Sequence, residues 1–205
     1  MAAKRRIATR LKSTFGFKKA PFAKNLEVDK PFRPEPFERG LDRLRYLTDR
    51  RGIGALFGTP GTGKSTLLRC FLDSLGKATH VACYVNNTTC ATLDLHREIA
   101  RSFGLVPGYR KADVLREIQD RVKKLARVQK IQPVLVIDEA HLLPAGFLDE
   151  VRILTSFDAD SRDDLTLILS GQPQLETNLR LAVNEALSQR IIIKVRLRSL
   201  HPCLL

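Results

Sequence analysis

A glycine-rich segment of eight residues constrains the fold of this chain more than any other feature. Gly58-Thr59-Pro60-Gly61-Thr62-Gly63-Lys64-Ser65 matches the pattern G-x-x-x-x-G-K-[ST], in which the glycines let successive backbone N–H groups turn toward a phosphate. An apolar run over residues 53–57 precedes the segment, and a helical pattern follows it over residues 65–75. This strand–loop–helix order predicts a phosphate-binding loop that points the positive end of a helix at its ligand.

The loop and the first helical residues are expected to bind a nucleotide and its metal ion. We expect Lys64 to neutralise the β- and γ-phosphate oxygens and the Ser65 hydroxyl to ligate Mg²⁺. The nucleotide-binding residues expected from the pattern are Gly58, Thr59, Pro60, Gly61, Thr62, Gly63, Lys64, Ser65 and Thr66.

A second motif consists of an apolar run, residues 134–137, followed by Asp138 and Glu139. A strand in an open α/β sheet would place Asp138 at its carboxyl end, where such sheets bind ligands, and this carboxylate is expected to hold Mg²⁺. Glu139 is expected to orient and polarise the attacking water. This pair favours hydrolysis over binding alone, and because no N-K-x-D motif is present, ATP is favoured over GTP.

The segment Asp138-Glu139-Ala140-His141 also spells the second motif of a large class of helicases. Those enzymes need two RecA-like domains, and 205 residues leave no room for a second one. We therefore expect His141 to pack locally rather than to couple ATP to unwinding.

Two more polar features follow in the sequence. The apolar run 165–169 leads into Ser170-Gly171-Gln172, and a polar side chain there can sense the γ-phosphate, with Gln172 preferred and Ser170 second. Arg190 closes a helical pattern before the last apolar run, where it can either reach a neighbouring subunit's nucleotide as an arginine finger or cap helix carbonyls. We favour the role as an arginine finger.

Apolar runs alternate with helical patterns along most of the chain. Because the strands are continuous apolar runs, they predict an α/β fold with a parallel sheet of about five strands and helices on both faces. Strands are expected at 53–57, 79–86, 133–137, 165–169 and 191–197. Helices are expected at 35–50, 65–75, from about 87 to 103, and at 114–125, 145–157 and 174–187.

Composition excludes several classes of protein. With 43% hydrophobic residues the chain can bury a core, yet no apolar run approaches the roughly 18 residues of a membrane-spanning helix. We expect no membrane segment, no secretory signal and a cytoplasmic location. The four cysteines lack C-x-x-C spacing, so buried thiols are expected rather than disulfides or zinc.

The net charge of +13 is concentrated at the two ends. Residues 1–24 hold eight Lys or Arg and residues 186–205 hold four, and neither stretch contains an acid. Such an arm is typical of binding to phosphates, as in double-stranded DNA, but a solvated tail and a transit peptide remain open from charge alone.

The order of these motifs resembles that of the AAA+ ATPases. More closely, the chain resembles bacterial transposition helper ATPases and the general secretion pathway protein A (ExeA-type) ATPases, over roughly residues 15–197. Besides the two nucleotide motifs, the resemblance rests on Phe15-Gly16-Phe17, Pro21-Phe22, Gly171-Gln172-Pro173-Gln174-Leu175 and Ala186-Leu187-Ser188-Gln189-Arg190-Ile191.

The resemblance implies a P-loop NTPase core of the AAA+ type at 35–198, after a basic, Phe/Pro-rich arm at 1–34. Residues 199–205 are too short for the helical lid of the family, so we expect the lid to be absent and hydrolysis to be weak. The resemblance favours an ATPase that assembles as a ring or filament of identical subunits on duplex DNA and directs a transposase. A secretion-pathway ATPase and a truncated nucleotide-binding remnant are the alternatives.

Overall fold

The computed structural model describes Thr14 and residues 33–199, except residues 87, 145 and 156–162. The chain divides into two compact units, Met1–Phe32 and Arg33–Leu205. The basic arm expected at 1–34 therefore lies almost wholly outside the described residues. The description below concerns the second unit.

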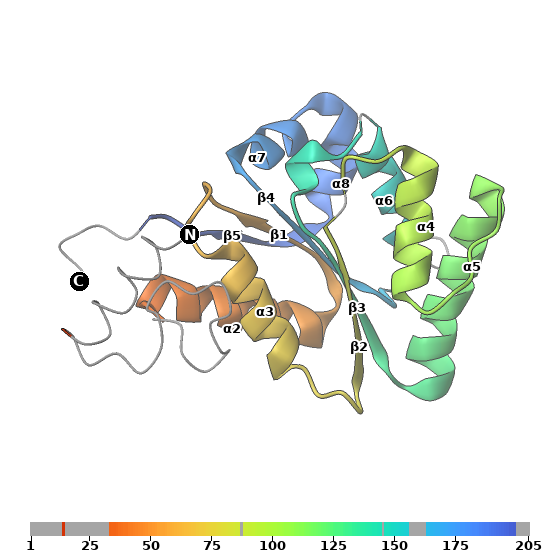
Figure 1. Ribbon diagram of the computed structural model, residues 1–205, viewed down its shortest axis with the longest axis horizontal. Coiled ribbons are helices and arrows are strands. Elements are labelled where there is room, and N and C mark those ends of the chain that lie inside the picture. The colour runs from red at the N-terminus through yellow and green to blue at the C-terminus, as the bar shows by residue number, and fades with distance from the viewer. Residues whose placement is uncertain (1–13, 15–32, 87, 145, 156–162, 200–205) are drawn as a thin grey trace. The chain divides into compact units, whose positions relative to one another are not determined.

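The centre of this unit is a sheet of five parallel strands, which confirms the expected α/β fold (Figure 1). The strand order is β2-β3-β4-β1-β5. The strands are β1 (Gly52–Phe57), β2 (His80–Val85), β3 (Gln132–Ile137), β4 (Thr166–Gly171) and β5 (Ile191–Arg196).

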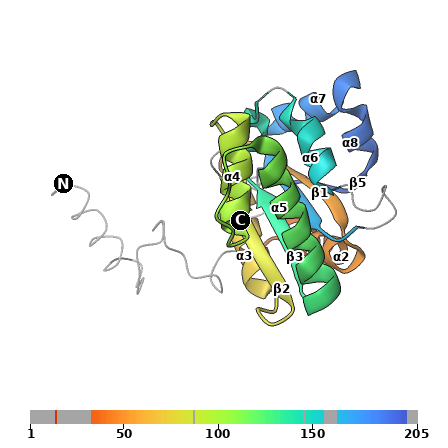
Figure 2. The ribbon, with the colours of Figure 1, turned by 90° about the vertical axis from the view of Figure 1, so that its right-hand side faces the viewer.

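Helices cover both faces of the sheet, and Figure 2 presents the side that carries α4 and α5. The helix α2 (Glu35–Arg50) and α3 (Lys64–Ser74) pack on one face. The other face carries α4 (Thr92–Ser102), α5 (Lys111–Lys123) with a π-helical turn (Lys124–Gln129), α6 (Phe147–Thr155), α7 (Pro173–Leu179) and α8 (Glu185–Gln189). Among the described helices, none is long and apolar enough to cross a membrane.

The strand order brings three sequence motifs to one edge of the sheet. Phe57 pairs with Gly171, and Ile137 pairs with Leu169, so β1, β4 and β3 end side by side. Gly58, Asp138 and Gln172 are the residues that follow these strands. The carboxyl edge of the sheet therefore carries the phosphate-binding loop, the acidic motif and the polar strand end together.

The expectation of one helix over 174–187 is wrong. The segment forms α7 and α8, separated by a turn and a 3-10 helix at Ala182–Asn184. The N–H of Arg180 donates to the carbonyls of Glu176 and Thr177, and Nδ2 of the buried Asn184 donates to the Asn178 carbonyl at 2.8 Å. These bonds satisfy the last carbonyls of α7 and end it early, which a continuous apolar pattern does not reveal.

Two glycines allow α2 to lie close to the strands and to α3. A Cβ atom on Gly40 would meet Leu67 Cδ1 at 2.8 Å and Val195 Cγ1 at 3.3 Å. A Cβ atom on Gly54 would meet Leu47 Cδ2 at 2.4 Å. The close approach fixes α2 against β1 and β5, so the exposed flank of α2 borders the outer strand of the sheet.

Candidate nucleotide-binding site

The glycine-rich loop has the backbone shape that its sequence requires. Gly61 and Gly63 have φ values of 81° and 89°, a left-handed conformation that side chains with a Cβ rarely adopt. Thr62 Oγ1 donates to the Thr59 carbonyl at 2.8 Å, and α3 begins at Lys64 directly after the second glycine. The loop therefore ends at the N-terminus of a helix whose first N–H groups have no helical partner.

Lys64 is buried, with 6% of its surface exposed. Its ammonium donates to the carbonyls of Gly58 at 2.8 Å and Thr59 at 3.1 Å. Among the residues that the structure describes, these neutral oxygens are its recorded partners, and no carboxylate forms an ion pair with it. A buried cation without a counter-charge is costly unless an anion reaches it.

Asp138 is 2% exposed and is held by three donors from three parts of the chain. Ser65 Oγ on α3 and Tyr84 Oη on β2 donate to Oδ2 at 3.3 and 2.6 Å. The Glu139 N–H donates to Oδ1 at 2.9 Å. The Ser65 hydroxyl and the Asp138 carboxylate, both expected metal ligands, thus lie within hydrogen-bond distance of each other.

Glu139 adopts the left-handed conformation, with φ 52° and ψ 34°, immediately after β3. This backbone conformation is uncommon for a residue with a side chain, so contacts with neighbouring residues must stabilise it. Thr88, 1% exposed, supplies one restraint by donating its hydroxyl to the Glu139 carbonyl at 3.0 Å. The Glu139 side chain remains 40% exposed, beside the buried Asp138.

His141 lies between the acidic motif and the end of β4. Its side chain is 4% exposed, and Nδ1 is 3.4 Å from both Glu139 Oε2 and the Gln172 backbone nitrogen. Nδ1 accepts from the Gln172 N–H only when it carries no proton, and it donates to Glu139 only when it does. The proton position of the ring therefore decides whether Nδ1 bonds Glu139 or Gln172.

The two residues expected as phosphate sensors differ in their surroundings. Gln172 is half-buried at the start of α7, and its backbone N–H is the group that reaches His141. Ser170 is fully buried, and its hydroxyl has no hydrogen-bond partner among the described residues. Both lie at the carboxyl end of β4.

Arg190 lies at the opposite edge of the sheet, directly before β5. A six-residue strand spans about 20 Å, so this side chain is remote from the loop of its own chain. Its guanidinium lies against α6, with Nη2 3.5 Å from the Thr155 carbonyl and 3.9 Å from Asp163 Oδ1. The geometry excludes a role for Arg190 at its own chain's loop.

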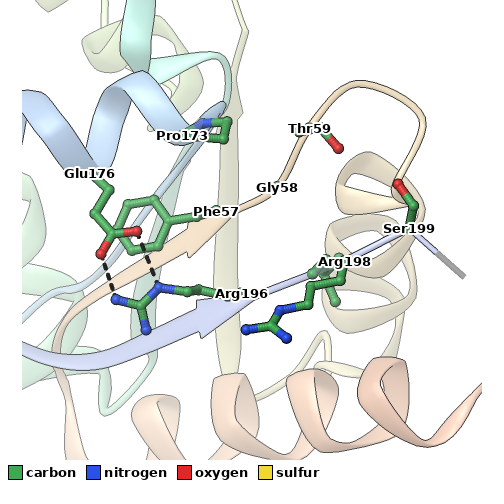
Figure 3. A pocket seen from close by; sticks show the side chains of 9 residues that line it. Phe57, Gly58, Thr59, Pro173, Glu176, Arg196, Arg198 and Ser199 are labelled. Atoms are coloured by element: carbon green, nitrogen blue, oxygen red, sulfur yellow. Dashed lines mark hydrogen bonds and ion pairs between the residues drawn. The ribbon is translucent and has the colours of Figure 1, made fainter.

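A pocket of about 340 Å³ adjoins the phosphate-binding loop beside β5 (Figure 3). Gly58 and Thr59 form one wall, and an ion pair between Glu176 of α7 and Arg196 of β5 forms another. The Arg196 guanidinium also lies 5.9 Å from the centre of the Phe57 ring. The hydrogen bond from Arg196 lowers the pKa of Glu176 to about 2, so the Glu176 carboxylate stays ionised at neutral pH.

Tyr84 and Thr88 belong to the site, although the sequence motifs do not indicate them. Burial first, and then the hydrogen bond to Asp138, raises the pKa of the Tyr84 phenol, so this group is a proton donor at neutral pH. Tyr84 reaches Asp138 because β2 and β3 are neighbours, with Tyr84 opposite Val136. A polar-tipped aromatic residue near the end of a strand is the only sequence signal for this contact.

Residues 47–179 match the family model described as AAA domain. The chain belongs to this family. The match spans β1 to α7 and includes the loop and the acidic motif. The protein is therefore a P-loop ATPase of the AAA+ class, as its motifs predict.

A curated relative and several solved structures resemble the chain. General secretion pathway protein A of Aeromonas hydrophila is 34% identical over 188 residues, which cover 89% of this chain and 34% of that protein. The chain thus spans about a third of the length of this relative.

The structures share the fold at low sequence identity. The ORC2 protein of Aeropyrum pernix, in ADPNP and ADP complexes, has a TM-score of 0.66 and 17% identity over 86% of this chain and 50% of that one. The ORC1 protein of Aeropyrum pernix in complex with DNA has a TM-score of 0.65 and 18% identity over 88% of this chain and 48% of that one. These likenesses support the AAA+ fold.

Proposed function

We propose that the chain binds and hydrolyses ATP with Mg²⁺ at the carboxyl edge of the sheet. The observation that carries the proposal is the hydrogen bond of 3.3 Å between Ser65 and Asp138, directly after a loop into which the buried Lys64 directs its ammonium. A hydroxyl and a carboxylate are hard oxygen donors, which fit Mg²⁺ bound together with phosphates. A buried ammonium fits the phosphates themselves.

The loop binds and orients the nucleotide in this account. Backbone N–H groups of the loop, other than Pro60, would donate to the phosphates, and Lys64 would turn its donors from the Gly58 and Thr59 carbonyls to phosphate oxygens. The nucleoside lies in the pocket beside Gly58 and Thr59, whose volume of about 340 Å³ suits a small ligand.

Ser65 and Asp138 hold the Mg²⁺ ion, which when bound neutralises charge on the phosphate oxygens. Glu139 accepts the proton of the attacking water, because its exposed carboxylate lies next to Asp138 while its backbone is fixed by Thr88. Gln172, with Ser170 as the second candidate, senses the γ-phosphate at the end of β4.

Arg190 completes the site of a neighbouring subunit in this proposal. Its place at the edge of the sheet opposite the loop means that it can assist phosphoryl transfer only in a homo-oligomer, a ring or a filament. To do so the guanidinium must leave its partners within its own chain, which include the Thr155 carbonyl at 3.5 Å and Asp163 Oδ1 at 3.9 Å. Assembly and release of Arg190 are therefore linked.

Replacing Tyr84 by phenylalanine is expected to raise the Mg²⁺ concentration for half-maximal turnover about tenfold. The change removes the 2.6 Å donor that fixes the Asp138 carboxylate, and losing such a partner of a metal ligand typically costs 10–100-fold in metal affinity or activity. Turnover measured across a Mg²⁺ titration tests this, with Tyr109→Phe, at an exposed tyrosine, as the matched control. Equal Mg²⁺ dependence of both variants would show that Tyr84 does not position Asp138.

We further propose that the ATPase binds double-stranded DNA and acts as a transposition helper in the cytoplasm, with a transposase as its partner. The +13 net charge and the basic ends of the chain support DNA as the ligand. The 34% identity to general secretion pathway protein A supports the alternative, a role in a secretion pathway. The two roles predict different responses to a duplex.

Duplex binding measured by fluorescence anisotropy separates these roles. If the chain is a DNA-dependent helper, binding to a random-sequence duplex should be tighter with a non-hydrolysable ATP analogue than with ADP, and should weaken steeply between about 50 and 200 mM salt. If the chain does not bind the duplex with either nucleotide, the result favours the secretion role.

A further inference from the structure

One flank of α2 carries a line of basic and aromatic side chains. Arg39, Arg43, Tyr46 and Arg50 follow one another at intervals of four, three and four residues, which places them on one side of the helix. All four are exposed, and the Arg50 guanidinium lies 5.5 Å from the centre of the Tyr46 ring. The line runs from the second turn of the helix to its last residue.

The outer strand β5 borders this flank of α2. Val195 of β5 faces Gly40 of α2, so the alternating Lys194 and Arg196 extend from the opposite face of the sheet, where Arg196 pairs with Glu176 of α7. Arg43 reaches the edge of β5, because its Nη1 donates to the Lys194 carbonyl at 3.3 Å. Between α2 and β5 lies a cleft of about 190 Å³ that Arg39, Arg43 and Arg196 line together with Gly40.

The α2–β5 basic surface is defined as Arg39, Arg43, Tyr46 and Arg50, together with the cleft that Arg39 and Arg43 share with β5. Three acids of α2, Glu38, Asp42 and Asp49, follow a line about 100° further from β5, whereas Glu35 lies one turn before Arg39 on the basic side. Most of the acidic side chains of α2 therefore lie away from this surface.

Few acids neutralise the charge of this surface among the described residues. Arg43 donates to a neutral carbonyl, so it keeps its charge. Arg39 lies 3.4 Å from Glu35, but both side chains are more than half exposed, and such a pair is weak. Arg196 lines the cleft but is bound to Glu176 in two hydrogen bonds, so it is not included (Figure 3).

We propose that the α2–β5 basic surface binds the phosphate backbone of duplex DNA. The α2 line is about 16 Å long at 1.5 Å per residue, which is long enough to contact successive phosphates of one strand. The cleft between α2 and β5 is large enough for one phosphate group. Tyr46 adds a stacking or sugar contact beside Arg50.

This inference rests on the proposed DNA binding and assigns it to a surface outside the ATP site. The surface is independent of the basic arm at residues 1–24, so both can contribute. It also borders the strand that forms one wall of the pocket beside the phosphate loop, since Arg196 lines both that pocket and the cleft.

The double variant Arg39→Ala/Arg43→Ala tests the surface. Its duplex affinity, measured by anisotropy with an ATP analogue, should fall roughly tenfold or more at about 50 mM salt, and the slope of log K against log salt should decrease by about 2. The charge-conserving Arg39→Lys/Arg43→Lys variant should retain most of the affinity and the slope. ATP turnover without DNA should be unchanged in both, which shows that they fold.

The matched control removes two charges from another part of the chain. Arg116→Ala/Lys124→Ala, at exposed positions of α5 and the turn after it, lies on the other face of the sheet and should change the affinity less than about twofold. Equal losses in both double variants would overturn the assignment but leave DNA binding in place. No wild-type binding to the duplex would overturn both, and equal binding to polyglutamate would exclude DNA as the specific ligand.

Discussion

Lys64→Ala is expected to weaken ATP binding by at least about a hundredfold. Lys64 is buried and its ammonium contacts two loop carbonyls, so alanine removes the one cation inside the loop. Removing one partner of a buried charge pair costs about 3–5 kcal/mol, which is roughly a hundredfold or more in Kd. Titration of a fluorescent ATP analogue measures the effect.

Lys77→Ala is the matched control for this variant, because Lys77 is exposed just beyond α3 and outside the loop. Its Kd for ATP should equal that of the wild type. Thermal unfolding without nucleotide should show that the Lys64 variant is folded. Retention of wild-type affinity by a folded Lys64→Ala protein would contradict the proposed phosphate site.

Glu139→Gln is expected to bind ATP normally but to lower kcat by at least about a hundredfold. Glutamine keeps the shape of the side chain, and the backbone contacts to Asp138 and Thr88 do not involve it. What is lost is the carboxylate that accepts the proton of water, and a general base typically contributes 10²–10⁴-fold. Single-turnover hydrolysis, with the Kd measured in parallel, separates the two parameters.

The comparison of the two variants identifies the role of Glu139. Lys64→Ala should lose binding, whereas Glu139→Gln should lose turnover alone. Glu150→Gln, at a carboxylate on α6 that contacts Lys111, serves as a control for loss of an acid elsewhere. Equal loss of ATP binding in the Lys64 and Glu139 variants would show that Glu139 acts in binding and not as the base.

Much of the fold is predictable from the sequence because the central strands β1, β3 and β4 are buried on both faces. Residues 53–57 and 133–137 are continuous apolar runs, and the structure places β1 and β3 there within one residue. The loop pattern is equally local, since Gly61 and Gly63 supply the left-handed conformations that the turn requires. Local patterns of this kind can be recognised in the sequence without knowledge of the strand order.

The surroundings of the acidic motif are not predictable in the same way. Tyr84 and Thr88 contact Asp138 and Glu139 across about fifty residues of sequence, as a consequence of the pairing of β2 with β3. His141 was expected to pack locally, and it is buried, but its contact with Gln172 depends on β4 lying beside β3. Predicting contacts between elements requires the order of strands in the sheet, and the hydrophobic periodicity of the sequence does not give that order.

Steady-state ATP turnover, with and without duplex DNA, tests the account most directly. We expect Mg²⁺-dependent turnover that rises with duplex at about 50 mM salt and loses this stimulation near 200 mM, while Lys64→Ala shows neither. Turnover that persists in Lys64→Ala, or its absence from a wild-type chain that binds ATP, would contradict hydrolysis at this site. Turnover that the duplex does not change would contradict the DNA-dependent role.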